Sequence, residues 1–153
     1  MINKKSYEQV LEENGILYWK VKGVSMLPMI REKRDIIVVT KRTEERFKKY
    51  DVVLFRRKET TMHISYVMHR ILKVNADGTY WIVGDNCYSG DIVKEEDIMG
   101  CLSALIRNGK TIQMDSCLYK VYIYLWCGLY PIRFFILRYK GYLQKIIKRA
   151  VKL

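Results

Sequence analysis

IMGCLSALIRNGKTIQM, residues 98–114, carries the strongest structural signal in the chain. Two apolar runs flank Asn108-Gly109, a dipeptide that favours a type I′ turn because both central residues must adopt positive φ. We therefore expect an antiparallel hairpin here. A second hairpin is predicted from residues 64–74 and 79–83, because the turn-forming segment NADG separates them. The segment after it, GDNCYSGD at 84–91, is rich in turn formers and is predicted as a loop.

Further apolar runs extend this β pattern toward the N-terminus. DIIVVT at 35–40 and DVVLF at 51–55 are short and rich in β-branched residues, which is typical of buried strands. ILYWKVK at 16–22 is a third strand candidate, and the charged stretch between 41 and 50 is predicted as a loop or one helical turn. The expected fold class is therefore mainly β.

Both ends of the chain are expected to be helical. Ser6 and Gln9 match a capping box, so a short helix should follow Ser6 and end at Asn14-Gly15. The apolar, aromatic segment 117–137 predicts C-terminal helical structure. We expect a short N-terminal helix in 1–15, a β-rich body in 16–114 and a hydrophobic, basic tail in 115–153.

The positive charge is concentrated in that tail. The 153 residues carry a formal net charge of +12, and no acidic residue follows Asp115. Eight basic residues lie beyond it: Lys120, Arg133, Arg138, Lys140, Lys145, Lys148, Arg149 and Lys152. The body alone is only mildly basic. The excess positive charge therefore suggests that an anionic partner binds the tail.

The tail resembles a segment that lies in a membrane interface. Its longest charge-free run, residues 121–132, is short compared with the roughly 20 apolar residues of a spanning helix. Its aromatic residues and basic end favour an interfacial or re-entrant segment on anionic lipid. Two alternatives remain, a helix packed on the β body with a solvated tail, and a nucleic-acid-binding tail. No recognised motif supports specific nucleic-acid binding.

The remaining composition indicates no metal site. Cys87, Cys101, Cys117 and Cys127 do not form a CxxC pair, and the chain has two histidines, so we expect buried, reduced thiols. No metal or organic cofactor is expected. The first ten residues contain no apolar run that would make a signal peptide or anchor.

GVSMLP, residues 23–28, is the first candidate for chemistry. Gly23 and Pro28 frame a tight segment that should hold Ser25 exposed. This serine is either a turn residue or a nucleophile that needs a neighbouring base.

Five motifs in order resemble the signal peptidase I family, which shares its fold and serine chemistry with LexA-type repressors. They are the GVSMLP segment, the pair of strands beginning at Asp35 and Asp51, MHRI at 68–71, GDN at 84–86 followed by Asp91, and IMG at 98–100. The resemblance covers about residues 20–107. Histidine stands where bacterial signal peptidases typically carry lysine, which is similar to the endoplasmic-reticulum and archaeal type.

The resemblance implies a serine endopeptidase that cleaves a signal or leader peptide. Ser25 would be the nucleophile, His69 the base, and Asp91 or Asp85 the carboxylate that orients His69. By position in the pattern, Asp91 is the triad member and Asp85 a neighbouring support. Backbone N–H groups near Ser25 would form the oxyanion hole.

The flanking residues of the serine motif, Gly23, Met26 and Pro28, would position this turn. The other histidine, His63, is left as a structural residue because no motif includes it. The hydrophobic segment follows the body, whereas signal peptidases usually carry an anchor ahead of the serine. We therefore expect membrane association at the cytoplasmic face and a substrate delivered from that side.

Two other classes of function remain open at this point. One is a LexA-like regulator that cleaves itself with a Ser25–Lys73 dyad. The other is an inactive scaffold that binds a membrane surface. Oligomeric state is not indicated by the sequence.

Overall fold

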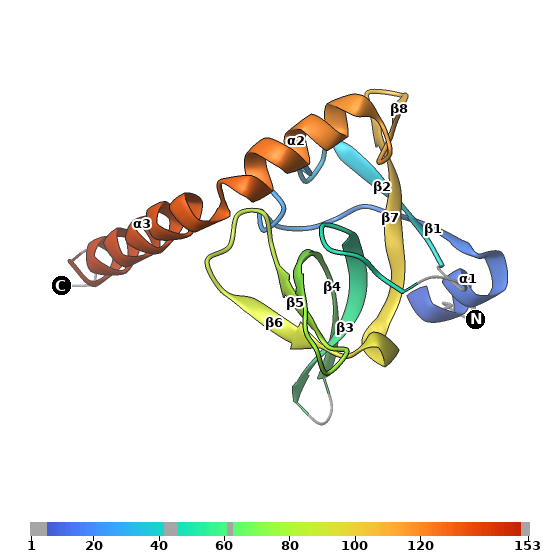
Figure 1. The fold of residues 1–153 in the computed structure, drawn as a ribbon, viewed down its shortest axis with the longest axis horizontal. Coiled ribbons are helices and arrows are strands. Elements are labelled where there is room, and N and C mark those ends of the chain that lie inside the picture. The colour runs from blue at the N-terminus through green and yellow to red at the C-terminus, as the bar shows by residue number, and fades with distance from the viewer. Residues whose placement is uncertain (1–5, 42–45, 61–62, 151–153) are drawn as a thin grey trace.

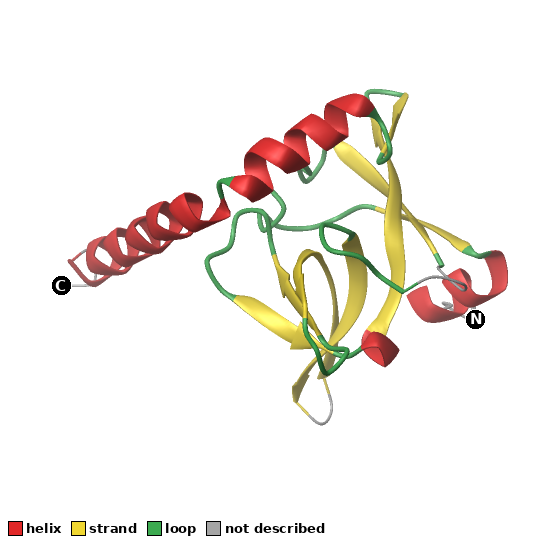
Figure 2. Cartoon of the chain, viewed as in Figure 1, coloured by secondary structure: helices red, strands yellow, loops and turns green. Residues whose placement is uncertain are grey.

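The computed structural model describes residues 6–41, 46–60 and 63–150 (Figure 1). Its elements are α1 (Tyr7–Asn14), β1 (Ile16–Trp19), β2 (Asp35–Thr40), β3 (Val52–Thr60), β4 (His63–Val74), β5 (Tyr80–Val83), β6 (Gly90–Val93), η1 (Glu95–Asp97), β7 (Ile98–Arg107), β8 (Lys110–Gln113), α2 (Cys117–Gly128) and α3 (Tyr130–Ala150). The described strands form one antiparallel sheet in the order β1-β2-β7-β3-β4-β5-β6, with β8 paired to β7. The mainly-β prediction is confirmed (Figure 2).

Both predicted hairpins are present. Asn108 and Gly109 have φ of 52° and 74°, so they join β7 to β8 with the positive φ angles that were expected. Strand β4 pairs with β5 across the turn at residues 75–79. The N-terminal helix also has its predicted ends, since Ser6 and Gln9 form a capping box and Gly15 is left-handed.

Three predicted boundaries were wrong. Strand β1 stops at Trp19 instead of residue 22, and its register with β2 ends at the Trp19–Ile37 pair. Strand β3 continues past its apolar run to Thr60, because its charged end pairs with β4. The expected loop 84–91 ends at residue 89, since Gly90 already pairs with β5. Part of the predicted 41–50 loop, residues 42–45, lies outside the described residues.

The core occupies both faces of the sheet. Val52 and Leu54 belong to one buried cluster, while Val53 and Phe55 belong to the other. Successive side chains of a strand point to opposite faces, so β3 is apolar at every position of this run. Because both faces of β3 are buried here, apolar residues occupy consecutive positions from 52 to 55 instead of alternating with polar ones.

The C-terminal helices have different surroundings. Helix α2 begins after the cap residue Ser116 and lies across the β body, whereas α3 projects away from it (Figure 1). Within the described residues, neither helix is long and apolar enough to span a bilayer by itself. Taken together, Cys117–Gly128 and Tyr130–Leu143 have the length and apolar composition of a membrane span, but the two helices meet at a bend of 64°.

Candidate active site

Ser25 lies in a tight turn between β1 and β2. The Val24 carbonyl accepts a hydrogen bond from the Leu27 N–H at 3.2 Å, which closes the turn around the serine. Gly23 enters it with φ of 91°, a conformation that favours glycine, and its N–H donates to Glu32 Oε2 at 2.9 Å. Ser25 is therefore half-buried and held by its neighbours on both sides.

Met26 and Pro28 make different contributions to this turn. The Met26 side chain is 5% exposed and belongs to the core, so it anchors the turn to the β body. Pro28 is exposed. The predicted positioning role is thus supported by burial for Met26 and by backbone geometry for Gly23.

His69 lies in the middle of β4, opposite Val53 of β3, and is 6% exposed. Burial, and after it the Arg57 guanidinium, lower the pKa of His69 to about 4, although the carboxylates of Asp91 and Asp85 act in the opposite direction. A histidine with this pKa is neutral at pH 7. It can therefore accept a proton, as a general base must.

The loop after β5 brings His69 and the serine turn together. Its Asn86 N–H donates to the Ser25 carbonyl at 2.7 Å, and the Asn86 side chain donates to the Val24 carbonyl at 3.2 Å. A Cβ at Gly84 would lie 2.7 Å from that Ser25 oxygen and 2.9 Å from His69 Nε2. Only glycine permits this close approach of the loop to both residues.

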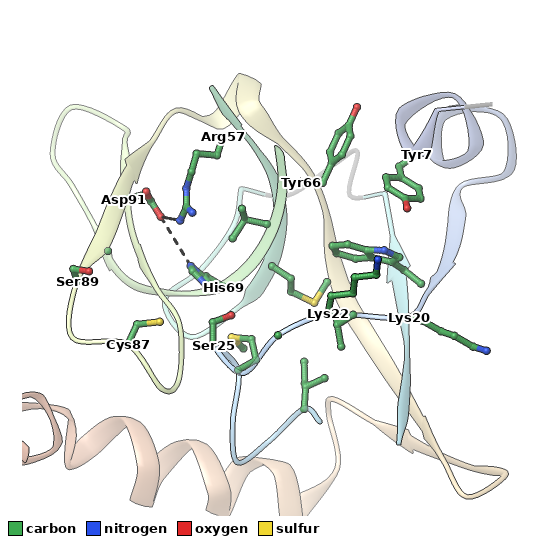
Figure 3. Close-up of a pocket in the computed structure, with 18 residues that line it drawn as sticks. Tyr7, Lys20, Lys22, Ser25, Arg57, Tyr66, His69, Cys87, Ser89 and Asp91 are labelled. Carbon is green, nitrogen blue, oxygen red and sulfur yellow. Dashed lines mark hydrogen bonds and ion pairs between the residues drawn. The ribbon is translucent and has the colours of Figure 1, made fainter. Parts of the chain in front are cut away.

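Asp91 is the carboxylate next to His69. Its Oδ2 lies 3.9 Å from His69 Nδ1, on the opposite side of the ring from Ser25 (Figure 3). The same oxygen accepts a hydrogen bond from Arg57. Among the described residues, the buried Nδ1 has no hydrogen-bond partner. Asp91 therefore lies beside Nδ1 while it is bonded to Arg57.

Asp85 lies in a different environment. Arg70 Nε and Nη2 donate to its two carboxylate oxygens at 2.8 and 2.7 Å, and both side chains are almost fully buried. His69 and Arg70 are consecutive in β4, so their side chains point to opposite faces. Asp85 consequently pairs with Arg70 and not with the His69 ring.

A groove of about 970 Å³ runs past these groups. Ser25, His69, Cys87 and Asp91 line one part of it, and Tyr7 and Tyr66 line the other (Figure 3). Lys73, the alternative partner for Ser25, is exposed and is not part of this lining.

Several contributors to the site were missed from the sequence. Arg57 and Cys87 line the groove, and Tyr122 and Trp126 contact Asp85 from helix α2. Arg57 follows an apolar run, so the sequence suggests only a solvated strand end. Cys87, Tyr122 and Trp126 belong to none of the motifs. The signal available for Arg57 was its even spacing from Phe55, which places both on one face of β3.

The cysteines match the expected buried thiols only in part. Cys101 and Cys127 are buried, Cys87 is half-buried in the groove, and Cys117 is exposed at the start of α2. Burial raises the pKa of the Cys87 thiol, which therefore stays protonated at neutral pH. Within the described residues, no cluster of His, Cys, Asp and Glu could hold a metal ion.

No protein-family model, curated protein or solved structure matches the chain. The resemblance to signal peptidases remains a prediction that rests on the ordered motifs.

Replacing Arg57 with glutamine should raise the pKa of His69 from about 4. The change removes a cation that disfavours imidazolium and releases the Asp91 carboxylate beside Nδ1. We expect an increase of about one unit, measured by NMR titration of the imidazole. A base with a higher pKa becomes protonated at a higher pH. If His69 is the base of a peptidase, the fall of kcat/KM on the acid side should therefore begin at a higher pH in the variant.

Arg56→Gln provides the matched control. Arg56 is the neighbouring strand residue, and it pairs with Glu8 and Asp97 instead of Asp91. An unchanged His69 pKa in Arg57→Gln, or an equal increase in Arg56→Gln, would contradict the assigned role of Arg57.

Proposed function

We propose that this protein is a serine endopeptidase of the signal peptidase-like class, which cleaves a signal or leader peptide. The observation that carries the proposal is the meeting of a half-buried serine, a neutral buried histidine and a carboxylate in one groove. These are three groups that acyl transfer by a serine nucleophile requires. Their order in the chain matches the motifs that suggested this class.

The proposed reaction begins at Ser25. Its Oγ attacks the scissile carbonyl while His69 Nε2 takes the hydroxyl proton, and His69 then gives that proton to the leaving amine. Asp91 stabilises the imidazolium from the Nδ1 side. N–H groups of the turn bind the oxyanion. A water molecule, deprotonated by His69, then hydrolyses the acyl-enzyme and restores Ser25.

Contacts around Ser25 and His69 support these roles. The loop bond from Asn86 fixes the main chain of Ser25, and Gly84 lets His69 Nε2 lie close to that main chain. The apolar groove residues Val21, Met26 and Met68 offer a surface for an extended peptide. The alternative dyad has less support, because Lys73 is exposed and lies outside the groove lining.

The proposal includes association with an anionic membrane at the cytoplasmic face. An apolar surface on the two helices remains uncovered, and its members are Leu118, Val121, Tyr124, Leu125, Leu129, Ile132, Phe135, Ile136, Tyr139, Tyr142, Leu143, Ile146 and Ile147. Basic residues accompany this surface, and no acidic residue follows Asp115. Apolar burial and cationic charge together favour an interface of anionic lipid.

One experiment tests both parts of this proposal. Wild type and Ser25→Ala are incubated with a mixed peptide library and vesicles of phosphatidylcholine, with or without phosphatidylglycerol. Mass spectrometry identifies the cleaved bonds, and centrifugation measures the protein that sediments with vesicles. We expect cleavage by wild type alone, and sedimentation of both proteins with the phosphatidylglycerol vesicles alone.

Other outcomes identify the alternatives. Equal behaviour of the two proteins on every peptide would support the inactive membrane-binding scaffold and overturn the peptidase. Slow conversion of the wild-type chain to two fragments would support the self-cleaving regulator. Failure of both proteins to bind either type of vesicle would overturn the membrane part.

A further inference from the structure

Helix α2 presents two different faces. Tyr119, Tyr122 and Trp126 lie along the face toward the body, with successive rings stacked at 17° and centroids 6.4 and 6.0 Å apart. Tyr119 and Tyr122 also pack against the core cluster of the sheet. Leu118 and Tyr124 are more than 80% exposed and therefore lie on the outer face.

The inner face of α2 contacts Asp85 at two points. Tyr122 OH donates to the carboxylate Oδ2 at 3.0 Å, and Trp126 Nε1–H donates to the main-chain oxygen at 3.2 Å. Tyr119 OH accepts a hydrogen bond from Arg70 Nη1 at 2.9 Å. The helix therefore completes the buried Arg70–Asp85 pair with donors and an acceptor of its own.

This pair adjoins both segments that carry the candidate catalytic groups. Asp85 stands between Gly84, which lies against His69 Nε2, and Asn86, whose N–H donates to the Ser25 carbonyl. Arg70 Nη2 also lies 3.1 Å from Met29 Sδ, four residues after Ser25. A displacement of Asp85 would therefore be transmitted to the serine turn through one intervening residue.

Other contacts connect the same loop to the helices. A Cβ at Gly141 of α3 would lie 3.1 Å from the ring of Tyr88, so the two segments are in close contact. Trp81, at the base of the loop, packs edge-on against Tyr130 at 5.7 Å. Residues 84–89 are thus held between the β body and the C-terminal helices.

We propose that Tyr122 and Trp126 are positioning residues of the active site, which act through Asp85 on the loop that fixes Ser25. The inference rests on the proposed peptidase function. It assigns to α2 a role that its apolar composition did not indicate, because the polar atoms of two aromatic side chains make the connection. Neither residue lines the groove, so their effect on catalysis is indirect.

Tyr122→Phe tests the proposal, because it removes the hydroxyl donor and keeps the stacked ring. We expect kcat for a cleaved peptide to fall about tenfold with KM unchanged, since a hydrogen bond to a charged group is lost. Amide hydrogen exchange at Asn86 should accelerate by a similar factor. Trp126→Phe, which removes the Nε1 donor, should produce the same pattern.

Tyr18→Phe is the control, since it makes the same change on an exposed side chain of β1, outside the groove lining and away from the C-terminal helices. Wild-type kcat and wild-type Asn86 exchange in Tyr122→Phe and Trp126→Phe would overturn the positioning role. Equal losses in Tyr18→Phe would also overturn it. If wild type cleaves no peptide, the proposed function fails, while Asn86 exchange still reports whether α2 holds the loop.

Discussion

Replacing His69 with alanine should lower kcat by roughly 10⁵-fold, about as much as replacing Ser25, and the double variant should lose no more than either single one. The reason is that a nucleophile and its base act as a unit, so either loss removes the activated serine. The neutral state of His69 at pH 7 makes this role available without further proton loss. The measurement is kcat for a peptide that the wild type cleaves.

The second histidine provides the control for this prediction. His63 begins β4 on the same strand but belongs to none of the motifs, so His63→Ala should keep kcat within about twofold of wild type. If the fold-losses in kcat of the two single variants multiplied in the Ser25→Ala, His69→Ala double variant, that result would contradict a shared mechanism. A larger loss in Lys73→Ala than in His69→Ala would identify lysine as the base.

Replacing Arg70 with methionine should reduce the free energy of unfolding by about 3–5 kcal/mol. The Arg70 and Asp85 side chains are 0% and 1% exposed, so the substitution leaves a buried carboxylate without its cation. Methionine keeps similar bulk, and the remaining Tyr122 donor satisfies only part of the carboxylate. Urea unfolding monitored by circular dichroism measures the loss.

Arg107→Met offers a comparison at another buried aspartate. Asp35 accepts hydrogen bonds from both Arg107 and Arg34, so one cation remains after the substitution. We expect less than half of the Arg70→Met loss. Equal losses at the two sites would contradict the argument from an unpaired carboxylate, and a pair of apolar residues at positions 70 and 85 should recover part of the stability.

Local features of the sequence were sufficient to predict most of the β elements. Asn108-Gly109 determines its turn because few other residues adopt positive φ at both positions, and the Ser6 capping box acts within a single helical turn. The boundaries of β3 and β6 could not be predicted from the same evidence. They depend on partners in β4 and β5, which are distant in sequence.

The candidate site shows the same division between local and tertiary information. The order of the motifs selected Ser25, His69, Asp85 and Asp91 as candidates and placed Asp91 in the triad by position, but it gave no contact for either aspartate. In the structure, adjacent residues of β4 face opposite sides, so Asp91 lies near His69 and Asp85 pairs with Arg70. The alternation of side chains along β4 therefore gives the two carboxylates different partners, although they are only six positions apart in the sequence.

The C-terminal segment depended most on tertiary structure. Its composition alone indicated helical structure, apolar and aromatic side chains and basic charge, because these properties follow from residue types. Contacts of Tyr122 and Trp126 with Asp85 appear only when α2 packs across the body. A hydrogen bond between distant segments requires their packing in three dimensions, and residue type alone does not specify its partner.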